Sequence, residues 1–572
     1  MKANVRLLWG LRIPLRDGVS LSATGYFPRE MPVPGPCLLT LTPYIADRYH
    51  ERGVYFASHG FPFLAVDVRG RGNSGGEYAP FVHDAADAYD AIEWLARQSY
   101  CDGKVGMWGG SYAGYVQWAA AKEFPPSLAT IVPSSAPYLG LDFPMRANIF
   151  LAFTIRWLIY TSGRTPQSSI FEDEAFWSAM YRRWHESGES FQALDGVVGV
   201  RSDILQEWLE HPEPDAYWDA LNPSAEQYAQ MDYPILTITG SYDDDQCGAL
   251  EHYRRYLSGL TDEKKSKHFL IIGPWDHAGS RTPQLEFGGV RFGSQSLLDI
   301  PALHREWYAW TMKGGPRPSF LKGLVAYYVA GSDRWRYADT LENATGEVQS
   351  LFLDSQGRAN GVISDGVLGS APGYGAADSY FYDPRETSGP EIAAEEQTSG
   401  SALTDQSVLL ALGTKALVYQ SAPFERAVEV AGFFRLTLWV SIDCPDTDLY
   451  VSVHEIEVDG TGIRLSADAI RARYRESLRH PRLIESAQPL CYVFERFNFI
   501  AREIKAGSRL RLVIAPMGRL CESTFTEKNY QGGGIVASES ADNARPVNVR
   551  IYHDTTHPSV LLVPLGKASS FS

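Results

Sequence analysis

The chain has 572 residues, 44% of them hydrophobic, so it is too long for one ordinary domain and too apolar to be disordered. Its formal net charge of −16 argues against the broad basic surface with which proteins bind nucleic acid or anionic membranes. We therefore expect a well-packed globular protein of two or three domains.

The N-terminus and the cysteines indicate a cytoplasmic location. The opening residues, MKANVR, contain one Lys but no apolar segment and no small-residue cleavage site, so we expect no secretory signal. No uninterrupted apolar run is long enough for a bilayer. The six cysteines form no CxxC pair, which predicts reduced, mostly buried thiols and no metal site; they are Cys37, Cys101, Cys247, Cys444, Cys491 and Cys521.

Strands alternate with helices in the first 140 residues and again after residue 231. Alternation around Arg16-Asp17-Gly18 predicts an antiparallel hairpin over residues 5–27. Apolar runs predict buried strands, and helical spacing predicts the segments between them. The strands are expected at 37–41, 63–66, 105–108, 128–132, 233–239 and 268–274, and the helices at 49–58, 83–98, 113–122 and 298–312. This order predicts a doubly wound, mostly parallel sheet with functional groups at the carboxyl ends of its strands.

Residues 141–230 change to long helical segments crowded with aromatic side chains, which predicts a helical cap inserted into the sheet domain. Most aromatics at helical spacing are core residues. A cap above the edge of an α/β sheet can nevertheless cover an apolar substrate group.

From residue 324 onward, short β-rich runs alternate with clusters of Gly, Pro, Asp and Ser, which predicts a β-sandwich or jelly roll. Residues 357–406 have little strand signal and are expected to form a long surface connection. The predicted domains are therefore 1–140 with 231–323 (sheet domain), 141–230 (cap) and 324–572 (jelly roll).

One stretch, KVGMWGGSYAG at 104–114, indicates chemistry. A short buried strand runs into glycines around Ser111 and then into a helix, which is typical of the turn that exposes a nucleophilic serine. The next N–H, of Tyr112, lies at a helix N-terminus and suits an oxyanion. The alternative is a glycine-rich turn whose serine only caps the helix.

An acidic residue and a histidine follow two later strands, in the order Ser111, Asp243, His277. An imidazole can take a serine proton at neutral pH, and a carboxylate fixes the imidazole tautomer and stabilises its charged form. Taken singly, His277 could be an ordinary core or loop histidine and Asp243 a helix cap. Taken together, at strand ends and in this order, they predict a catalytic triad.

A second glycine-rich segment, DVRGRGNSGG at 67–76, superficially looks like a phosphate-binding loop. It lacks the GK[ST] ending of such loops and does not lie in a dinucleotide-binding context. We therefore predict a structural role for it.

Motifs at both ends of the chain match a known family. They are LRDGVSL at 15–21, TPY at 42–44, DVRGRGNSGGEY at 67–78, CDGKVGMWGGSY at 101–112, GSYD at 240–243, GPWDHAG at 273–279, CPDTD at 444–448 and RARYRE at 471–476. Together they resemble the serine hydrolases that include cocaine esterase, X-prolyl dipeptidyl peptidase, glutaryl-cephalosporin acylase and α-amino-acid ester hydrolase. The resemblance implies an α/β-hydrolase domain with a helical insertion and a C-terminal jelly roll.

The same resemblance assigns site residues. It implies that Ser111 is the nucleophile, Asp243 the acid and His277 the base. It further implies that the Tyr44 hydroxyl and the Tyr112 N–H form the oxyanion hole, where loss of one donor costs about a hundred- to a thousand-fold in rate.

Two stretches depart from the family pattern. Asp244 and Asp245 stand where Gly and an aromatic are usual, so the pocket is expected to be more acidic and to suit a cationic or polyhydroxylated substrate, unless these carboxylates cap a helix or face water. They also leave open which Asp orients His277. Residues 515–518, APMG, replace a Ser/Asn-rich stretch, so no substrate contact is transferred there.

The sequence therefore predicts a serine hydrolase, independent of cofactor and metal, that cleaves a small organic ester or amide through an acyl-enzyme. The alternatives are an X-Pro-type peptidase, an acyltransferase or macrolactone-forming enzyme, and a binding scaffold with an inactive hydrolase fold. We expect a monomer or homodimer without nucleic-acid or membrane partners. The expected substrate pocket contains Trp275, Phe150, Phe153, Trp157 and Asp245.

Overall fold

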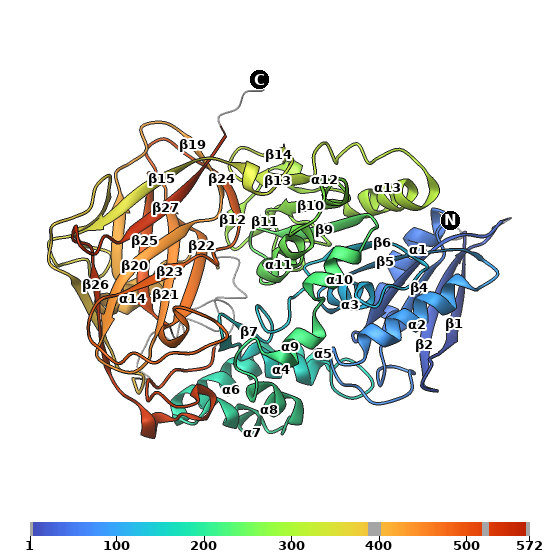
Figure 1. The fold of residues 1–572 in the computed structure, drawn as a ribbon, viewed down its shortest axis with the longest axis horizontal. Helices are drawn as coiled ribbons and strands as arrows, with labels where there is room; N and C mark the ends of the chain where they lie inside the picture. Colours follow the sequence, from blue (N-terminus) through green and yellow to red (C-terminus); the bar gives the residue numbers. More distant parts are fainter. Residues whose placement is uncertain (1–3, 32, 387–401, 518–525, 568–572) are drawn as a thin grey trace.

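The computed structural model describes residues 4–31, 33–386, 402–517 and 526–567. They form an α/β domain, a group of cap helices and a C-terminal β domain, and the cap helices lie beside both of the others (Figure 1). No helix in these ranges combines the length and the apolar character needed to cross a membrane.

The α/β domain is built on a sheet of ten strands within the described residues. In spatial order they are β1 (Val5–Pro14), β2 (Ser20–Pro28), β4 (Phe63–Asp67), β3 (Gly35–Thr42), β5 (Cys101–Gly110), β6 (Leu128–Ser134), β9 (Ile235–Gly240), β10 (His268–Gly273), β13 (Val325–Val329) and β14 (Arg334–Ala338). The strands from β4 to β13 are parallel, whereas β1, β2 and β14 are antiparallel to their neighbours. This matches the predicted entry hairpin and doubly wound sheet.

Helices cover both faces of this sheet, which explains why its central strands are continuous apolar runs. Strand β4 is buried throughout, and Leu64 and Val66 face the core under α2 (Asp84–Ala96) and α3 (Tyr112–Ala121). Phe63 and Ala65 face the core under α1 (His50–Ser58) and α13 (Ile300–Lys313). Two further helices, α11 (Gln246–Leu257) and α12 (Asp262–Lys265), connect β9 to β10, and a short hairpin of β11 (Glu286–Phe287) and β12 (Val290–Arg291) follows β10.

Strands β13 and β14 follow the predicted domain boundary at residue 323, but they pair with the α/β sheet and not with the strands of the C-terminal domain. Strand β13 pairs in parallel with β10 after the crossover through α13, and β14 pairs with β13 in antiparallel fashion. The sequence shows where the last strong helix ends, but it does not show with which sheet the next strand pairs.

The cap helices are mostly short, and among the described ones only α6, with 14 residues, approaches the long segments that the sequence predicts. They are α4 (Phe153–Tyr160), α5 (Ser168–Phe171), α6 (Glu174–Ser187), α7 (Leu194–Val198), α8 (Asp203–Leu209), α9 (Ala216–Leu221) and α10 (Ala225–Gln230), preceded by the hairpin β7 (Met145–Arg146) and β8 (Ile149–Phe150). Glycines in the left-handed conformation end two of them, at Gly188 and Gly199. Four buried tryptophans, Trp177, Trp184, Trp208 and Trp218, hold these short helices together.

The C-terminal domain joins thirteen described strands around one core. They are β15 (Thr345–Asp354), β16 (Gly366–Gly369), β17 (Asp378–Tyr382), β18 (Leu417–Ser421), β19 (Val428–Gly432), β20 (Arg435–Ile442), β21 (Asp448–Ile456), β22 (Gly462–Arg471), β23 (Leu490–Phe494), β24 (Ile500–Ile504), β25 (Arg509–Pro516), β26 (Val547–Tyr552) and β27 (Val560–Gly566), with the helix α14 (Ser407–Leu412). The predicted connection over 357–406 is wrong in part, because β16 and β17 lie within it; residues 387–401 lie outside the described residues.

Candidate active site

Ser111 sits on a sharp turn between β5 and α3, with φ of 60° and ψ of −130°. This is an uncommon conformation for a serine, and such strain is concentrated at functional sites. The turn is tight enough that a Cβ on Gly109 would lie 2.6 Å from the Ala113 Cβ, and one on Gly114 would lie 2.8 Å from the Ser134 oxygen. The serine therefore projects from the carboxyl end of the sheet at the start of a helix.

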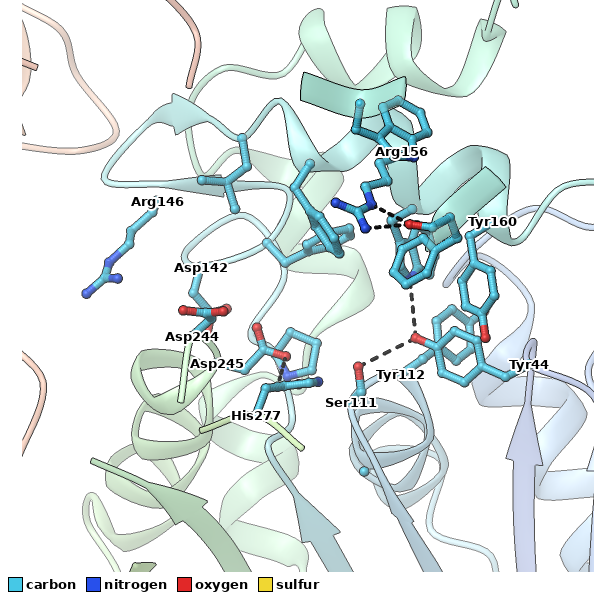
Figure 2. Close-up of a pocket in the computed structure, with 18 of the residues that line it drawn as sticks. Tyr44, Ser111, Tyr112, Asp142, Arg146, Arg156, Tyr160, Asp244, Asp245 and His277 are labelled. Carbon is cyan, nitrogen blue, oxygen red and sulfur yellow. Dashed lines mark hydrogen bonds and ion pairs between the residues drawn. The ribbon is translucent and has the colours of Figure 1, made fainter. Parts of the chain in front are cut away.

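The predicted oxyanion tyrosine lies beside the serine. The Tyr44 hydroxyl is 3.5 Å from Ser111 Oγ, and the Trp157 indole N–H donates to the Tyr44 oxygen at 3.1 Å (Figure 2). Burial raises the pKa of Tyr44 to about 12, so its hydroxyl stays neutral. Because Trp157 donates to the Tyr44 oxygen, the hydroxyl proton can point toward Ser111 and an oxyanion formed there.

The DVRGRG segment supports the loop that carries Tyr44. The Arg71 side chain is fully buried and donates to the Pro43 carbonyl at 2.9 Å and the Ser162 carbonyl at 2.6 Å. The Asp67 carboxylate accepts the Ala46 N–H at 2.7 Å. This segment thus ties the Tyr44 loop to the end of α4, in agreement with the predicted structural role.

Asp243 and His277 form the expected pair. Asp243 is fully buried, and its Oδ1 lies 2.9 Å from His277 Nδ1, whereas Asp245 Oδ2 is 3.6 Å from the same nitrogen. Thr239 also donates to the Asp243 carboxylate, at 2.7 Å. Burial is the largest single effect on Asp243 and opposes its ionisation, but the hydrogen bond and charge of His277 and the hydrogen bonds of Ser135 and Thr239 together lower the pKa of the carboxyl. The hydrogen bond that orients His277 therefore comes from Asp243.

The ionisation of His277 is set by competing effects. Burial lowers its pKa, but attraction to Asp245 and the hydrogen bond to Asp243 together raise it above the usual value. Ser111 and His277 line the same cavity, and within the described chain their side chains form no direct hydrogen bond. Catalytic hydrogen bonds are often long until substrate binds.

The cavity above Ser111 has a volume of about 570 Å³. Its aromatic wall includes Phe81, Phe143, Phe153, Trp157, Tyr160 and Phe171. Asp142, Asp244 and Asp245 lie on the His277 side of Ser111, and Tyr44 and Tyr160 lie on the other (Figure 2). Among the described residues, no group of three or more His, Cys, Asp or Glu side chains is arranged to hold a metal ion.

Burial raises the pKa of two of these carboxyls. Asp142 is 3% exposed and accepts N–H groups from Tyr138 at 2.8 Å and from Gly248 at 2.5 Å. Burial nevertheless raises the pKa of Asp142 to about 8. Burial also raises the pKa of Asp245 well above its ordinary value. A cation placed beside them would favour their charged forms.

The predicted pocket residues divide into two groups. Phe153, Trp157 and Asp245 line the cavity. Phe150 and Trp275 do not, and the prediction for them is wrong. The fully buried Phe150 ring packs on Phe191 with centroids 6.2 Å apart. The Trp275 indole donates to the Ser296 carbonyl at 3.0 Å and packs so closely on Gly273 that a Cβ there would lie 2.2 Å from its ring.

Sequence reasoning missed six charged residues that line the cavity, which are Arg48, Asp142, Arg146, Arg156, Glu174 and Arg281. Asp142 lies at the start of the predicted cap and in no recognised motif. Arg281 follows His277 by four residues, so its proximity to a predicted catalytic base was the one available signal.

Comparisons with known proteins agree with this architecture. The model of the X-Pro dipeptidyl-peptidase (S15 family) matches residues 17–279, and the model of the X-Pro dipeptidyl-peptidase C-terminal non-catalytic domain matches residues 320–517. The cocaine esterase of Rhodococcus sp. (strain MB1 Bresler) is 26% identical over 612 aligned positions, covering 99% of each chain.

Two solved structures share the fold over almost the whole chain. An α-amino acid ester hydrolase has a TM-score of 0.85 at 20% identity, with 98% of this chain and 97% of the other covered. An aminopeptidase from a marine sediment archaeon, Thaumarchaeota archaeon, has a TM-score of 0.82 at 21% identity, with 99% and 97% covered. These likenesses establish the α/β-hydrolase fold with a cap and a C-terminal β domain.

Proposed function

Because the chain belongs to the family of cocaine esterase and the X-Pro dipeptidyl-peptidases, we propose that it is a serine hydrolase that cleaves esters through an acyl-enzyme. The observation that carries the proposal is the strained turn at Ser111, whose Oγ lies 3.5 Å from the Tyr44 hydroxyl in a cavity shared with the His277–Asp243 pair.

In the proposed mechanism, His277 takes the Ser111 proton through Nε2, because its Nδ1 faces Asp243. Ser111 Oγ attacks the ester carbonyl, and the Tyr44 hydroxyl with the Tyr112 N–H stabilises the resulting oxyanion. His277 then returns the proton to the departing alkoxide. Water repeats the sequence on the acyl-enzyme, so the acyl group leaves as a carboxylic acid.

The charge and shape of the cavity favour an acyl group with a protonated amine and an apolar side chain. Asp142 is buried and Asp245 partly buried on the His277 side of the cavity, where an ammonium would compensate their charges. The aromatic wall suits the side chain. We therefore propose amino acid esters as substrates, the class after which the α-amino acid ester hydrolase of the same fold is named.

A second candidate function is cleavage of an amide that bears a free amino terminus, because the same carboxyl groups could bind that terminus. Comparing an Xaa-Pro p-nitroanilide with an amino acid p-nitrophenyl ester separates the two functions. An acyltransferase would give an ester product when an alcohol acceptor is added, and product analysis would identify it.

Fluorophosphonate labelling followed by intact-protein mass and peptide mapping tests the nucleophile. We expect one adduct on Ser111, absent in Ser111→Ala and present in the control Ser58→Ala, whose serine lies on the exposed end of α1. Turnover of short p-nitrophenyl esters should follow the same pattern. A folded wild-type protein with neither adduct nor turnover would refute the hydrolase proposal and favour a binding scaffold.

A further inference from the structure

One cationic side chain in the cavity is left without a protein partner. Arg281 is partly buried and lines the cavity, yet its guanidinium makes no hydrogen bond or ion pair with any described residue, and Nη1 is shielded from solvent. A guanidinium carries five N–H donors. Buried polar groups are almost always paired, so the shielded Nη1 is suited to bind an acceptor supplied by a ligand.

The other arginines that line the cavity are anchored. Arg48 Nη2 donates to Ser168 Oγ at 2.5 Å. Arg156 pairs with Glu174, with Nη1 3.1 Å from Oε2, and Arg146 Nη2 donates to Asn498 Oδ1 at 3.2 Å. Their positions are explained by contacts inside the protein, whereas the position of Arg281 is not.

Because Gly110 has no side chain, the Arg281 guanidinium fits directly beside Ser111. A Cβ on Gly110, the residue before Ser111, would lie 2.4 Å from Arg281 Nη1 and 2.6 Å from its Cδ. Arg281 therefore packs against the backbone that positions the serine. A ligand group bound to it would lie within a few bonds of the carbonyl that Ser111 attacks.

Arg281 adds a positive charge, unpaired among the described residues, to a cavity that also contains three aspartates. Burial is the largest influence on the pKa of Tyr49, which it raises, and on that of His277, which it lowers. The charge of Arg281 lowers both pKa values, so its guanidinium lies near Tyr49 as well as near His277. The Tyr49 hydroxyl lies 3.2 Å from Thr42 Oγ1, and the same oxygen accepts the Tyr44 N–H. Tyr49 therefore lies on the Tyr44 side of the cavity. The three aspartates lie on the other side of Ser111 from Tyr44 (Figure 2).

We propose that Arg281 binds a carboxylate on the part of the substrate that leaves, so that the preferred substrate carries an ammonium on its acyl part and a carboxylate on its leaving part. An ammonium at the aspartates and a carboxylate at Arg281 place the scissile carbonyl between them, over Ser111. Arg281 thereby selects esters of amino acids with hydroxy-carboxylic acids. This inference rests on the proposed function and names the substrate class of the same site.

The turnover test compares two phenylalanine esters that share an acyl group, one of ethanol and one of glycolic acid. The measured quantity is the ratio of kcat/KM for the glycolate ester to kcat/KM for the ethyl ester. We expect this ratio to fall roughly 10- to 100-fold in Arg281→Met, the range for loss of a charged hydrogen bond, and to recover in part in Arg281→Lys. The control Arg358→Met removes an arginine that is 81% exposed in the C-terminal domain.

A ratio that is the same in wild type and Arg281→Met would overturn the proposal, even if both rates change. That outcome is expected if Arg281 only affects the pKa of His277 or the stability of the fold, because such effects change kcat/KM for both esters alike.

A binding measurement separates this inference from the proposed function. In the Ser111→Ala background, the dipeptide Phe-Gly is compared with its C-terminal amide by calorimetry, with and without Arg281→Met. Tighter binding of the free carboxylate, lost with Arg281→Met, supports the assignment whether or not the wild type hydrolyses esters. Equal binding of the two ligands contradicts it. A wild type that turns over neither ester counts against the proposed function alone.

Discussion

At the scale of single residues, the site depends on groups whose hydrogen bonds define their roles. Tyr44 has its oxygen engaged by Trp157 and its hydroxyl next to Ser111, and burial keeps it protonated. His277 has Nδ1 engaged by Asp243, which leaves Nε2 for the serine. The Tyr44 hydroxyl is thus oriented to donate its proton toward Ser111, and His277 is oriented to accept a proton at Nε2.

Replacing Tyr44 by Phe tests the oxyanion assignment. The variant keeps the ring in the cavity wall but loses the donor, so we expect kcat to fall about a hundred- to a thousand-fold with a small change in KM. Steady-state kinetics on a p-nitrophenyl ester measure both constants. Tyr89→Phe, on α2 and outside the cavity, serves as the control. A kcat within a few-fold of wild type would exclude Tyr44 as an oxyanion donor.

The pH dependence tests the charges around His277. The base must be unprotonated, so kcat/KM for a neutral ester should rise with pH through the pKa of His277, which is raised above its usual value. The Asp245 charge contributes to that rise, so Asp245→Asn should move the midpoint to lower pH. Asp262→Asn, at an exposed position on α12, should leave the midpoint in place. A midpoint that moves upward in Asp245→Asn contradicts the assignment.

At the scale of elements, the turn between β5 and α3 fixes Ser111, the proposed nucleophile, because α3 packs directly against the end of β6. A Cβ on Gly114 would meet the Ser134 oxygen at 2.8 Å and the Ala136 Cβ at 3.0 Å. The Ser111 N–H meanwhile donates to the Ser134 carbonyl at 3.0 Å and the Ser135 carbonyl at 3.1 Å. The helix and the neighbouring strand thus leave little freedom to the serine.

Gly114→Ala tests this packing. The added methyl group contacts backbone that cannot move away freely, so we expect destabilisation of about 1–3 kcal/mol together with reduced esterase activity. Gly196→Ala in α7 is a matched control, because nothing lies within 4 Å of its added Cβ. Thermal unfolding should show a lower transition for Gly114→Ala alone. Equal transitions for the two variants would show that α3 can shift away from β6.

The sequence predicts elements better than it predicts the orientation of side chains. Apolar periodicity predicts the parallel sheet. The turns that follow its strands predict that Ser111, Asp243 and His277 lie at the carboxyl ends of those strands. The prediction that Phe150 and Trp275 line the pocket is wrong because periodicity does not show whether a buried ring packs in the core or faces a cavity. Arg281 was missed because its significance is the absence of a partner, which only the surrounding structure reveals.

At the scale of the whole molecule, the C-terminal domain helps to build the site although the matching family model describes it as non-catalytic. Asn498 Nδ2 donates to the Asp243 carbonyl at 3.3 Å, and Gln246 exchanges two hydrogen bonds with the Phe499 backbone. Arg471 pairs with Asp448 and Glu527, at 2.9 and 2.8 Å, and donates to the Asn148 carbonyl at 3.1 Å. The CPDTD and RARYRE motifs therefore hold the β7–β8 segment in place.

Arg471→Met tests this connection. The substitution leaves two buried carboxylates without their cation, so we expect a loss of about 3–5 kcal/mol and reduced ester turnover. Arg479→Met removes an exposed pair with Asp219 and should cost at most about 1 kcal/mol. Thermal unfolding of both variants measures the difference. Similar transitions for the two would mean that the buried network contributes little to domain docking.

The contact between Asn498 and the Asp243 loop has a consequence for biosynthesis. The strands of the α/β sheet are complete once residue 338 has been translated, and domains generally fold in the order of their synthesis. The acid loop, however, acquires its contacts from Asn498 and Phe499 only after a further 160 residues or so have left the ribosome. A nascent chain can thus bear Ser111 on a folded sheet before the rest of its site is assembled. Esterase activity should accordingly report completed chains and remain low in ribosome-bound intermediates.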